Sequence, residues 1–148
     1  MLSNQRLISS LAVFGLLPFF GATFLTMAGM LPSMMDPKEI FVGYSVLILA
    51  FLSGSLWGQV LDLADSIPSK VILGASNLIA LLGWASLGLS NYSLVIATLG
   101  LGYILILSLE YSFASLLFGD VSHTYFKLRF KLTSIVLVTH VLMVAFSI

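Results

Sequence analysis

The chain has 148 residues, of which 59% are hydrophobic and only 8% are charged, with six Lys or Arg balanced by six Asp or Glu. A soluble domain carries about 25% charged residues, so this composition excludes a water-facing surface, and six cations are too few for a nucleic-acid partner. Cysteine is absent and histidine occurs twice, so we expect no disulfide, catalytic residue, metal site or cofactor.

Long apolar segments alternate with short polar gaps along the whole chain. Five such segments each approach the roughly 20 residues that a membrane-spanning helix needs. We therefore predict an all-α integral membrane bundle of five transmembrane helices, forming a single domain over residues 1–148. The predicted spans cover residues 7–30, 40–61, 71–89, 92–118 and 128–148.

The first two spans contain strong helix signals. Pro18 lies near the middle of the first span and should kink it, because proline removes a backbone donor and clashes with the preceding turn. The second span should begin with Asp36 as N-cap and Pro37 at the first helical position, with Glu39 completing a capping box.

Two glycines four residues apart lie near the end of the second span. Gly54 and Gly58 form a GxxxG pair, a spacing that lets another helix approach closely. We expect the pair to pack against a helix of the same chain. The alternatives are a homodimer or a membrane-protein partner that docks on the same face.

The remaining spans differ in how they are connected. Ser90 and Asn91 leave only a short turn, so the third and fourth spans should form a tight antiparallel hairpin. The fourth span, at 92–118, is long enough to tilt or protrude. Residues 119–131 read as a polar loop, which the last span enters if it begins as early as Leu128. Asp120 is expected to pair with Arg129 in this loop.

Basic residues indicate how the chain is threaded. Because short cytoplasmic loops are enriched in Lys and Arg, the side with more of them should be cytoplasmic. With five spans, five basic residues fall on the N-terminal side and only Lys38 on the other. We therefore predict a cytoplasmic N-terminus and an outside C-terminus in an inner (plasma) membrane. The five are Arg6, Lys70, Lys127, Arg129 and Lys131.

Glu110 is the charged side chain that lies well inside a predicted span. It precedes Phe118 by eight residues, or roughly 12 Å, and an intramembrane carboxyl should face the bundle. It is either a proton-handling or ligand-binding group, or a glutamic acid that fixes helix packing. Other polar side chains of similar predicted depth are expected to form a cluster with it. These are Asn77, Trp57, Gln59 and Thr133.

His140 lies deeper, near the middle of the last span. Two special roles are open to it, as an axial haem ligand or as a proton-relay partner. The plainer interpretation is a neutral side chain that forms a hydrogen bond to a neighbouring helix.

Three parts of the chain resemble the small polytopic membrane family called domain of unknown function 3429, which includes an animal mitochondrial transmembrane protein. They are Gly15-Leu16-Leu17-Pro18-Phe19, the run from Tyr44 to Gly58, and Asp120 followed by Tyr125, Leu128, Arg129, Leu132 and Thr133. Ser45 and Ser53 stand where that family usually has glycine, and Ser55-Leu56 replaces a segment that often carries histidine. The family supplies no activity to carry over. The resemblance implies structural positions at Pro18, Gly54, Trp57, Gly58, Asp120 and Arg129.

No nucleophile, base or metal constellation emerges, and the spans leave no room for a soluble domain. Our leading hypothesis is therefore a non-enzymatic membrane protein that binds a partner or a lipid-like ligand. One alternative is a small carrier or proton-coupled transporter that uses Glu110, alone or together with His140 and as a homodimer. Another, based on size and helix number alone, is a porphyrin- or sterol-binding translocator-like protein.

Overall fold

The computed structural model describes residues 7, 10–30, 35–61, 66–118 and 122–146, and these residues are helical or in short connections, without strands. Five helices among them are long and apolar enough to cross a membrane, which confirms the predicted all-α architecture. They are Ser10–Met27, Pro37–Val60, Ile67–Gly88, Tyr92–Ser112 and Phe126–Phe146.

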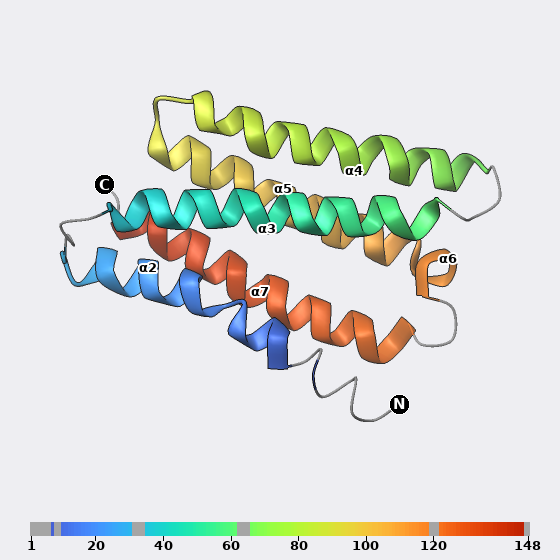
Figure 1. Ribbon diagram of the computed structural model, residues 1–148, viewed down its shortest axis with the longest axis horizontal. Helices are drawn as coiled ribbons and strands as arrows, with labels where there is room; N and C mark the ends of the chain where they lie inside the picture. The colour runs from blue at the N-terminus through green and yellow to red at the C-terminus, as the bar shows by residue number, and fades with distance from the viewer. Residues whose placement is uncertain (1–6, 8–9, 31–34, 62–65, 119–121, 147–148) are drawn as a thin grey trace.

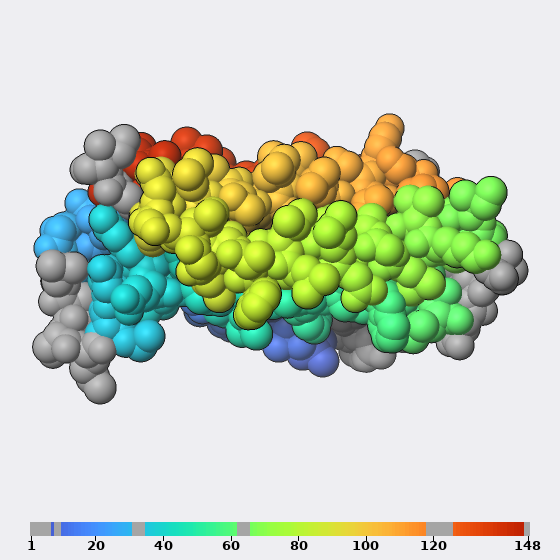
Figure 2. All heavy atoms as spheres, turned by 90° about the horizontal axis from the view of Figure 1, so that it is seen from above, coloured from blue at the N-terminus to red at the C-terminus, as the bar shows by residue number. Residues whose placement is uncertain are grey.

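The helices run up and down in sequence order around a central α3 (Figure 1). α3 contacts α2, α4 and α5, while α7 packs on α5 and α2. Seen from the side of α4, the atoms of α4 and α5 form one elongated face (Figure 2). The bounds are α2 Leu17–Met27, α3 Pro37–Val60, α4 Ile67–Ala85 with the short 3-10 turn η1 Ser86–Gly88, α5 Tyr92–Ser112, α6 Ala114–Phe118 and α7 Ser122–Phe146.

Pro18 interrupts the first span, as predicted. The helix that ends at Phe14 is followed by a turn at residues 15 and 16, and α2 restarts with Pro18 in its first turn. The break leaves the Gly15 carbonyl available, and the Tyr44 hydroxyl of α3 donates a hydrogen bond to it over 2.9 Å. Since a buried carbonyl without a donor is costly, this bond stabilises the break and fixes the first span against α3.

Local capping signals set where the other helices begin. Asp36 Oδ1 accepts a hydrogen bond from the Lys38 backbone N–H over 2.8 Å, and Pro37 is the first residue of α3, as predicted. Asn91 caps α5 in the same way, accepting from the Leu94 N–H over 3.1 Å. The short connection between η1 and α5 confirms the predicted hairpin of the third and fourth spans (Figure 1).

Two boundaries near the polar connection were predicted wrongly. The fourth span ends at Ser112 rather than 118, because the backbone leaves helical geometry at Phe113 and continues as the separate α6. The expected loop at 119–131 is mostly helix, since α7 already begins at Ser122. No glycine or proline follows Ser122, so nothing in the sequence stops the helix from starting that early.

The close helix contacts use glycines other than the GxxxG pair. Leu49 of α3 is inserted between α4 and α5, where a Cβ on Gly102 would lie 2.6 Å from Leu49 Cδ2 and one on Gly83 would lie 3.0 Å from it. Gly54 and Gly58 are exposed, and a Cβ on either would meet no atom within 4 Å. The expected packing of this pair within the chain is therefore wrong.

Candidate functional site

A buried ion pair joins α5 to α7. Arg129 Nε donates to both carboxylate oxygens of Glu110, over 3.0 Å to Oε1 and 3.1 Å to Oε2, and Nη2 donates to Oε1 over 2.5 Å. The side chains are 13% and 3% exposed, respectively. Glu110 thus faces the bundle, as expected, and its charge is compensated by a fork of donors that suits a carboxylate.

The ion pair lies near one end of the bundle rather than deep within it. Glu110 comes two residues before the end of α5 at Ser112, so the predicted depth of roughly 12 Å was an overestimate. The error follows from placing the end of the span at Phe118. Arg129 was assigned to a loop for the related reason that the start of α7 was placed too late. Its expected partner, Asp120, lies outside the described residues.

The polar cluster predicted around Glu110 forms only in part. Asn77 is exposed on α4, where its amide donates to the carbonyl of Leu73 in the preceding turn. Trp57 is 42% exposed. Thr133 is buried on α7, one turn beyond Arg129 and on the same face. Sequence depth alone placed these residues at similar levels, but it did not determine which face of each helix they occupy.

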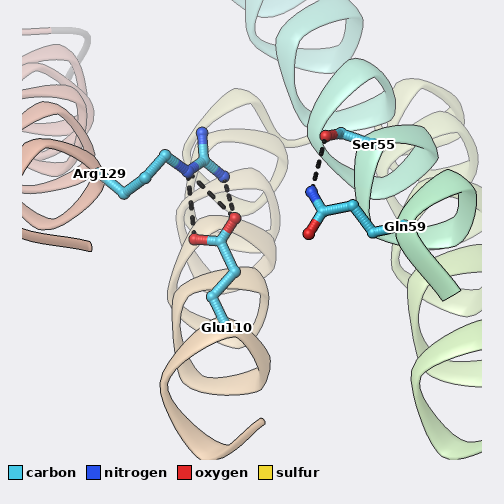
Figure 3. Close-up of polar contacts among 4 residues, drawn as sticks. All are labelled: Ser55, Gln59, Glu110 and Arg129. Carbon is cyan, nitrogen blue, oxygen red and sulfur yellow. Dashed lines mark hydrogen bonds and ion pairs between the residues drawn. The ribbon is translucent and has the colours of Figure 1, made fainter. Parts of the chain in front are cut away.

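Gln59 completes the polar end of the bundle from α3. Its side chain extends toward the Glu110–Arg129 pair, and its Nε2 donates to Ser55 Oγ over 3.3 Å (Figure 3). Its Oε1 is buried without a hydrogen-bond partner among the described residues. The polar side chains gathered at this end therefore come from α3, α5 and α7.

A cavity of about 460 Å³ lies beside the ion pair; we call it the lateral cavity. Leu11 and Phe51 at its rim are 61% and 69% exposed, so the cavity opens sideways, toward the apolar surroundings of the bundle. Its volume falls within the range of roughly 300–1,000 Å³ that is typical of small-molecule sites. It is lined by Leu11, Ala12, Gly15, Leu16 and Phe19 of the first span, Ile48, Phe51, Leu52 and Ser55 of α3, Tyr103 of α5, and Leu128, Arg129, Leu132, Thr133 and Val136 of α7.

His140 belongs to a separate cluster farther along α7. Its Nδ1 lies 2.8 Å from the Val136 carbonyl, which only accepts, so Nδ1 carries the proton. Its Nε2 lies 2.9 Å from Ser45 Oγ, and in a neutral ring it accepts from that hydroxyl. Both ring nitrogens are engaged within the protein. The geometry matches the plainer interpretation of a histidine that forms a hydrogen bond between helices.

Aromatic rings enclose this histidine. The ring centroids of Phe41, Tyr103 and Phe19 lie 4.9, 5.3 and 5.9 Å from that of His140. Tyr103 also donates to the Ser45 carbonyl over 2.9 Å. No hydrogen bond among the described residues joins this cluster to Glu110. The structure therefore keeps the two candidate proton-handling groups in separate networks.

Ser45, Tyr103 and the cavity itself were not anticipated from the sequence. One signal was present on α7, where Arg129, Thr133, Val136 and His140 recur at intervals of four, three and four residues. This spacing places them on a single face of a helix. Had the helix been recognised from Ser122 onward, that face would have linked the ion pair, the cavity wall and the histidine.

The family DUF3429, described as a protein of unknown function, matches residues 4–145, which is nearly the whole chain. The chain belongs to this family. Comparison with curated proteins and with solved structures found no match. Membership of DUF3429 assigns neither a ligand nor a reaction to the chain.

The positions that suggested DUF3429 divide into two groups in the structure. Pro18 breaks the first span, and Arg129 holds α5 to α7, so both have structural roles. Gly54, Trp57 and Gly58 instead lie on the exposed surface of α3, and a Cβ on either glycine would meet no atom within 4 Å.

Proposed function

We propose that this protein is a non-enzymatic membrane protein that binds a lipid-like ligand in the lateral cavity. The observation that carries the proposal is the cavity itself, which has largely apolar walls, a sideways opening and a polar end at Arg129. A ligand that is dissolved in the bilayer could enter past Leu11 and Phe51 without crossing water. Both carboxylate oxygens of Glu110 are engaged by Arg129 within the protein, which suits a binding site better than a reaction centre.

Filling the cavity should remove the ligand. Ala12 lines the cavity and is partly buried, so Ala12→Trp should displace a bound molecule. The neighbouring Val13 is 57% exposed and is not part of the cavity lining, so Val13→Trp is the matched control. Both variants are purified in a mild detergent, and the lipid-like molecules in their organic extracts are quantified by mass spectrometry. A stoichiometric molecule should persist in Val13→Trp and be absent from Ala12→Trp; equal extracts contradict the proposal.

We also propose that the protein lies in an inner (plasma) membrane with its N-terminus in the cytoplasm. Lys70, Lys127 and Lys131 lie at the end of the bundle where α4 and α7 begin, whereas Lys38 lies at the opposite end, where α3 begins. A fluorescent protein fused to the C-terminus should remain dark, and alkaline phosphatase fused there should be active, because that end is predicted to be outside. Bright fluorescence from the C-terminal fusion contradicts this orientation.

The exposed glycines suggest how a second copy would associate. We propose that Gly54 and Gly58 form the seam of a homodimer, since small residues on an outer helix face allow two backbones to approach. Gly54→Leu should convert a dimer to a monomer in light-scattering measurements without affecting the fold, because the space around Gly54 is open. Gly74→Leu is the control, because Gly74 is equally exposed and open but lies on α4, outside the proposed seam. If light scattering shows that the unaltered protein is a monomer, the proposed dimer seam is excluded.

A further inference from the structure

We propose that the ligand of the lateral cavity is an uncharged amphiphile whose polar end is a hydrogen-bond acceptor, such as an ester or ketone carbonyl, held by Arg129 and Thr133. The inference rests on the proposed function and specifies the chemical class of the ligand. It is carried by two donor groups that line the same cavity and that the protein leaves without partners.

The first donor group is the outer nitrogen of Arg129. Nε and Nη2 are occupied by Glu110, whereas the remaining nitrogen, Nη1, points away from the carboxylate (Figure 3). Nη1 donates no hydrogen bond among the described residues. Because a guanidinium carries donors and no acceptors, this nitrogen can bind only an acceptor. The Glu110 carboxylate fixes the plane of the guanidinium, so Nη1 is held in place before a ligand arrives.

The second donor is the hydroxyl of Thr133, one helical turn beyond Arg129. Thr133 is 5% exposed and lines the cavity, and its hydroxyl forms no hydrogen bond among the described residues. Residues four apart lie on the same helix face, so Arg129 and Thr133 can donate to one acceptor group or to two adjacent ones. The hydroxyl oxygen is not itself fully buried, so an acceptor on a ligand in the cavity can reach it and form a hydrogen bond.

The charge balance of the cavity favours an uncharged ligand. Among the described residues that line it, Arg129 alone is charged, and its charge is matched by the Glu110 carboxylate in contact with it. A carboxylate or phosphate on the ligand would therefore add a negative charge that no cation in the lining balances. An ester or ketone oxygen accepts the same hydrogen bonds without adding charge.

The shape of the cavity orients the ligand. Along α7 the lining runs from Leu128 to Val136, a distance of about 12 Å at the helical rise per residue. Arg129 lies at the end nearer the start of α7, Thr133 lies one turn farther in, and the apolar lining extends to Phe19 and Val136. An amphiphile therefore fits with its polar group toward the membrane surface and its chain toward the middle of the bilayer.

A competition experiment separates the chemical classes. Tritiated methyl palmitate is bound to the purified protein in detergent at pH 9, and bound label is measured by scintillation proximity. Unlabelled methyl palmitate, palmitate and hexadecane have similar hydrocarbon chains and differ in their polar ends. Methyl palmitate carries a neutral acceptor, palmitate carries an anion, and hexadecane has no polar group. Methyl palmitate should displace the label at a concentration about tenfold lower than the other two. If hexadecane competes as well as methyl palmitate, or palmitate competes better, the inference about the polar group is overturned. The proposal that the cavity binds a lipid-like ligand would still stand.

Removing a single hydroxyl tests the assigned donor. Thr133→Val should weaken methyl palmitate binding by about threefold to tenfold, the loss expected for one hydrogen bond, and leave hexadecane binding unchanged. Thr139→Val is the control, because Thr139 donates to the Val136 carbonyl and does not line this cavity. Unchanged methyl palmitate affinity in Thr133→Val overturns the assignment. If none of the three compounds binds the unaltered protein and the extracts of Ala12→Trp and Val13→Trp are also equal, the proposed function itself fails.

Discussion

Replacing Arg129 by leucine should lower the free energy of unfolding by about 3–5 kcal/mol, the usual cost of leaving one member of a buried ion pair without its partner. Glu110 is 2% exposed, and the hydrogen bonds to its carboxylate come from Arg129. In the variant the carboxylate has neither a cation nor water to solvate it. The loss is measured as a shift in the unfolding transition of the detergent-solubilised protein.

The matched double variant determines whether charge or packing causes this loss. Replacing Glu110 and Arg129 together by leucine removes both charges, and such replacements are often neutral or stabilising. The double variant should therefore recover most of the stability that Arg129→Leu loses. Lys127→Leu removes an exposed cation from the same helix and should change stability by no more than about 0.5 kcal/mol. A double variant as unstable as Arg129→Leu contradicts the role of the ion pair.

The predicted difference in stability between Arg129→Leu and the double variant has a consequence for function. If the pair adds little net stability, its contribution lies in what it holds in place. In this structure it fixes the guanidinium plane at the polar end of the lateral cavity and joins α5 to α7. The double variant should therefore remain folded and yet lose its preference for methyl palmitate over hexadecane.

Features encoded within a few residues of the chain were predictable from the sequence. The break at Pro18 and the cap at Asp36 depend on adjacent backbone atoms, and both are confirmed. The five spans follow from apolar length alone. Partners distant in sequence were not predictable in this way. The hydrogen bond of His140 to Ser45 joins residues 95 apart, and they meet only because α3 and α7 both pack against α2 and α5.

The glycines also show that contacts between helices cannot be predicted from local sequence. The GxxxG spacing of Gly54 and Gly58 is visible in the sequence, but spacing does not reveal which helix, if any, lies opposite. Gly83 and Gly102 have no such spacing and still form the tightest contacts, because both face Leu49. The lateral cavity is likewise a property of the assembled helices, since its walls come from four of the spans.

Phe19→Ala should destabilise the protein by about 3 kcal/mol, because Phe19 lies at the centre of the aromatic cluster on the inner side of the lateral cavity. It is 1% exposed, with ring centroids 5.1 Å from Tyr44, 5.4 Å from Phe41 and 5.9 Å from His140. Phenylalanine-to-alanine changes in cores cost roughly 3–5 kcal/mol. The lower value applies here because lipid is as apolar as the core, so the loss comes mainly from packing.

A second phenylalanine on α2 provides the control for this prediction. Phe24 is 66% exposed, so lipid or detergent replaces its contacts, and Phe24→Ala should change the unfolding free energy by no more than about 0.5 kcal/mol. Both variants are compared by unfolding in the same detergent. Because Phe19 also lines the cavity, its removal extends the cavity toward His140, and Phe19→Ala should accept longer-chain esters than the unaltered protein. Equal destabilisation by the two changes would show that the ring cluster does not hold the first span in place.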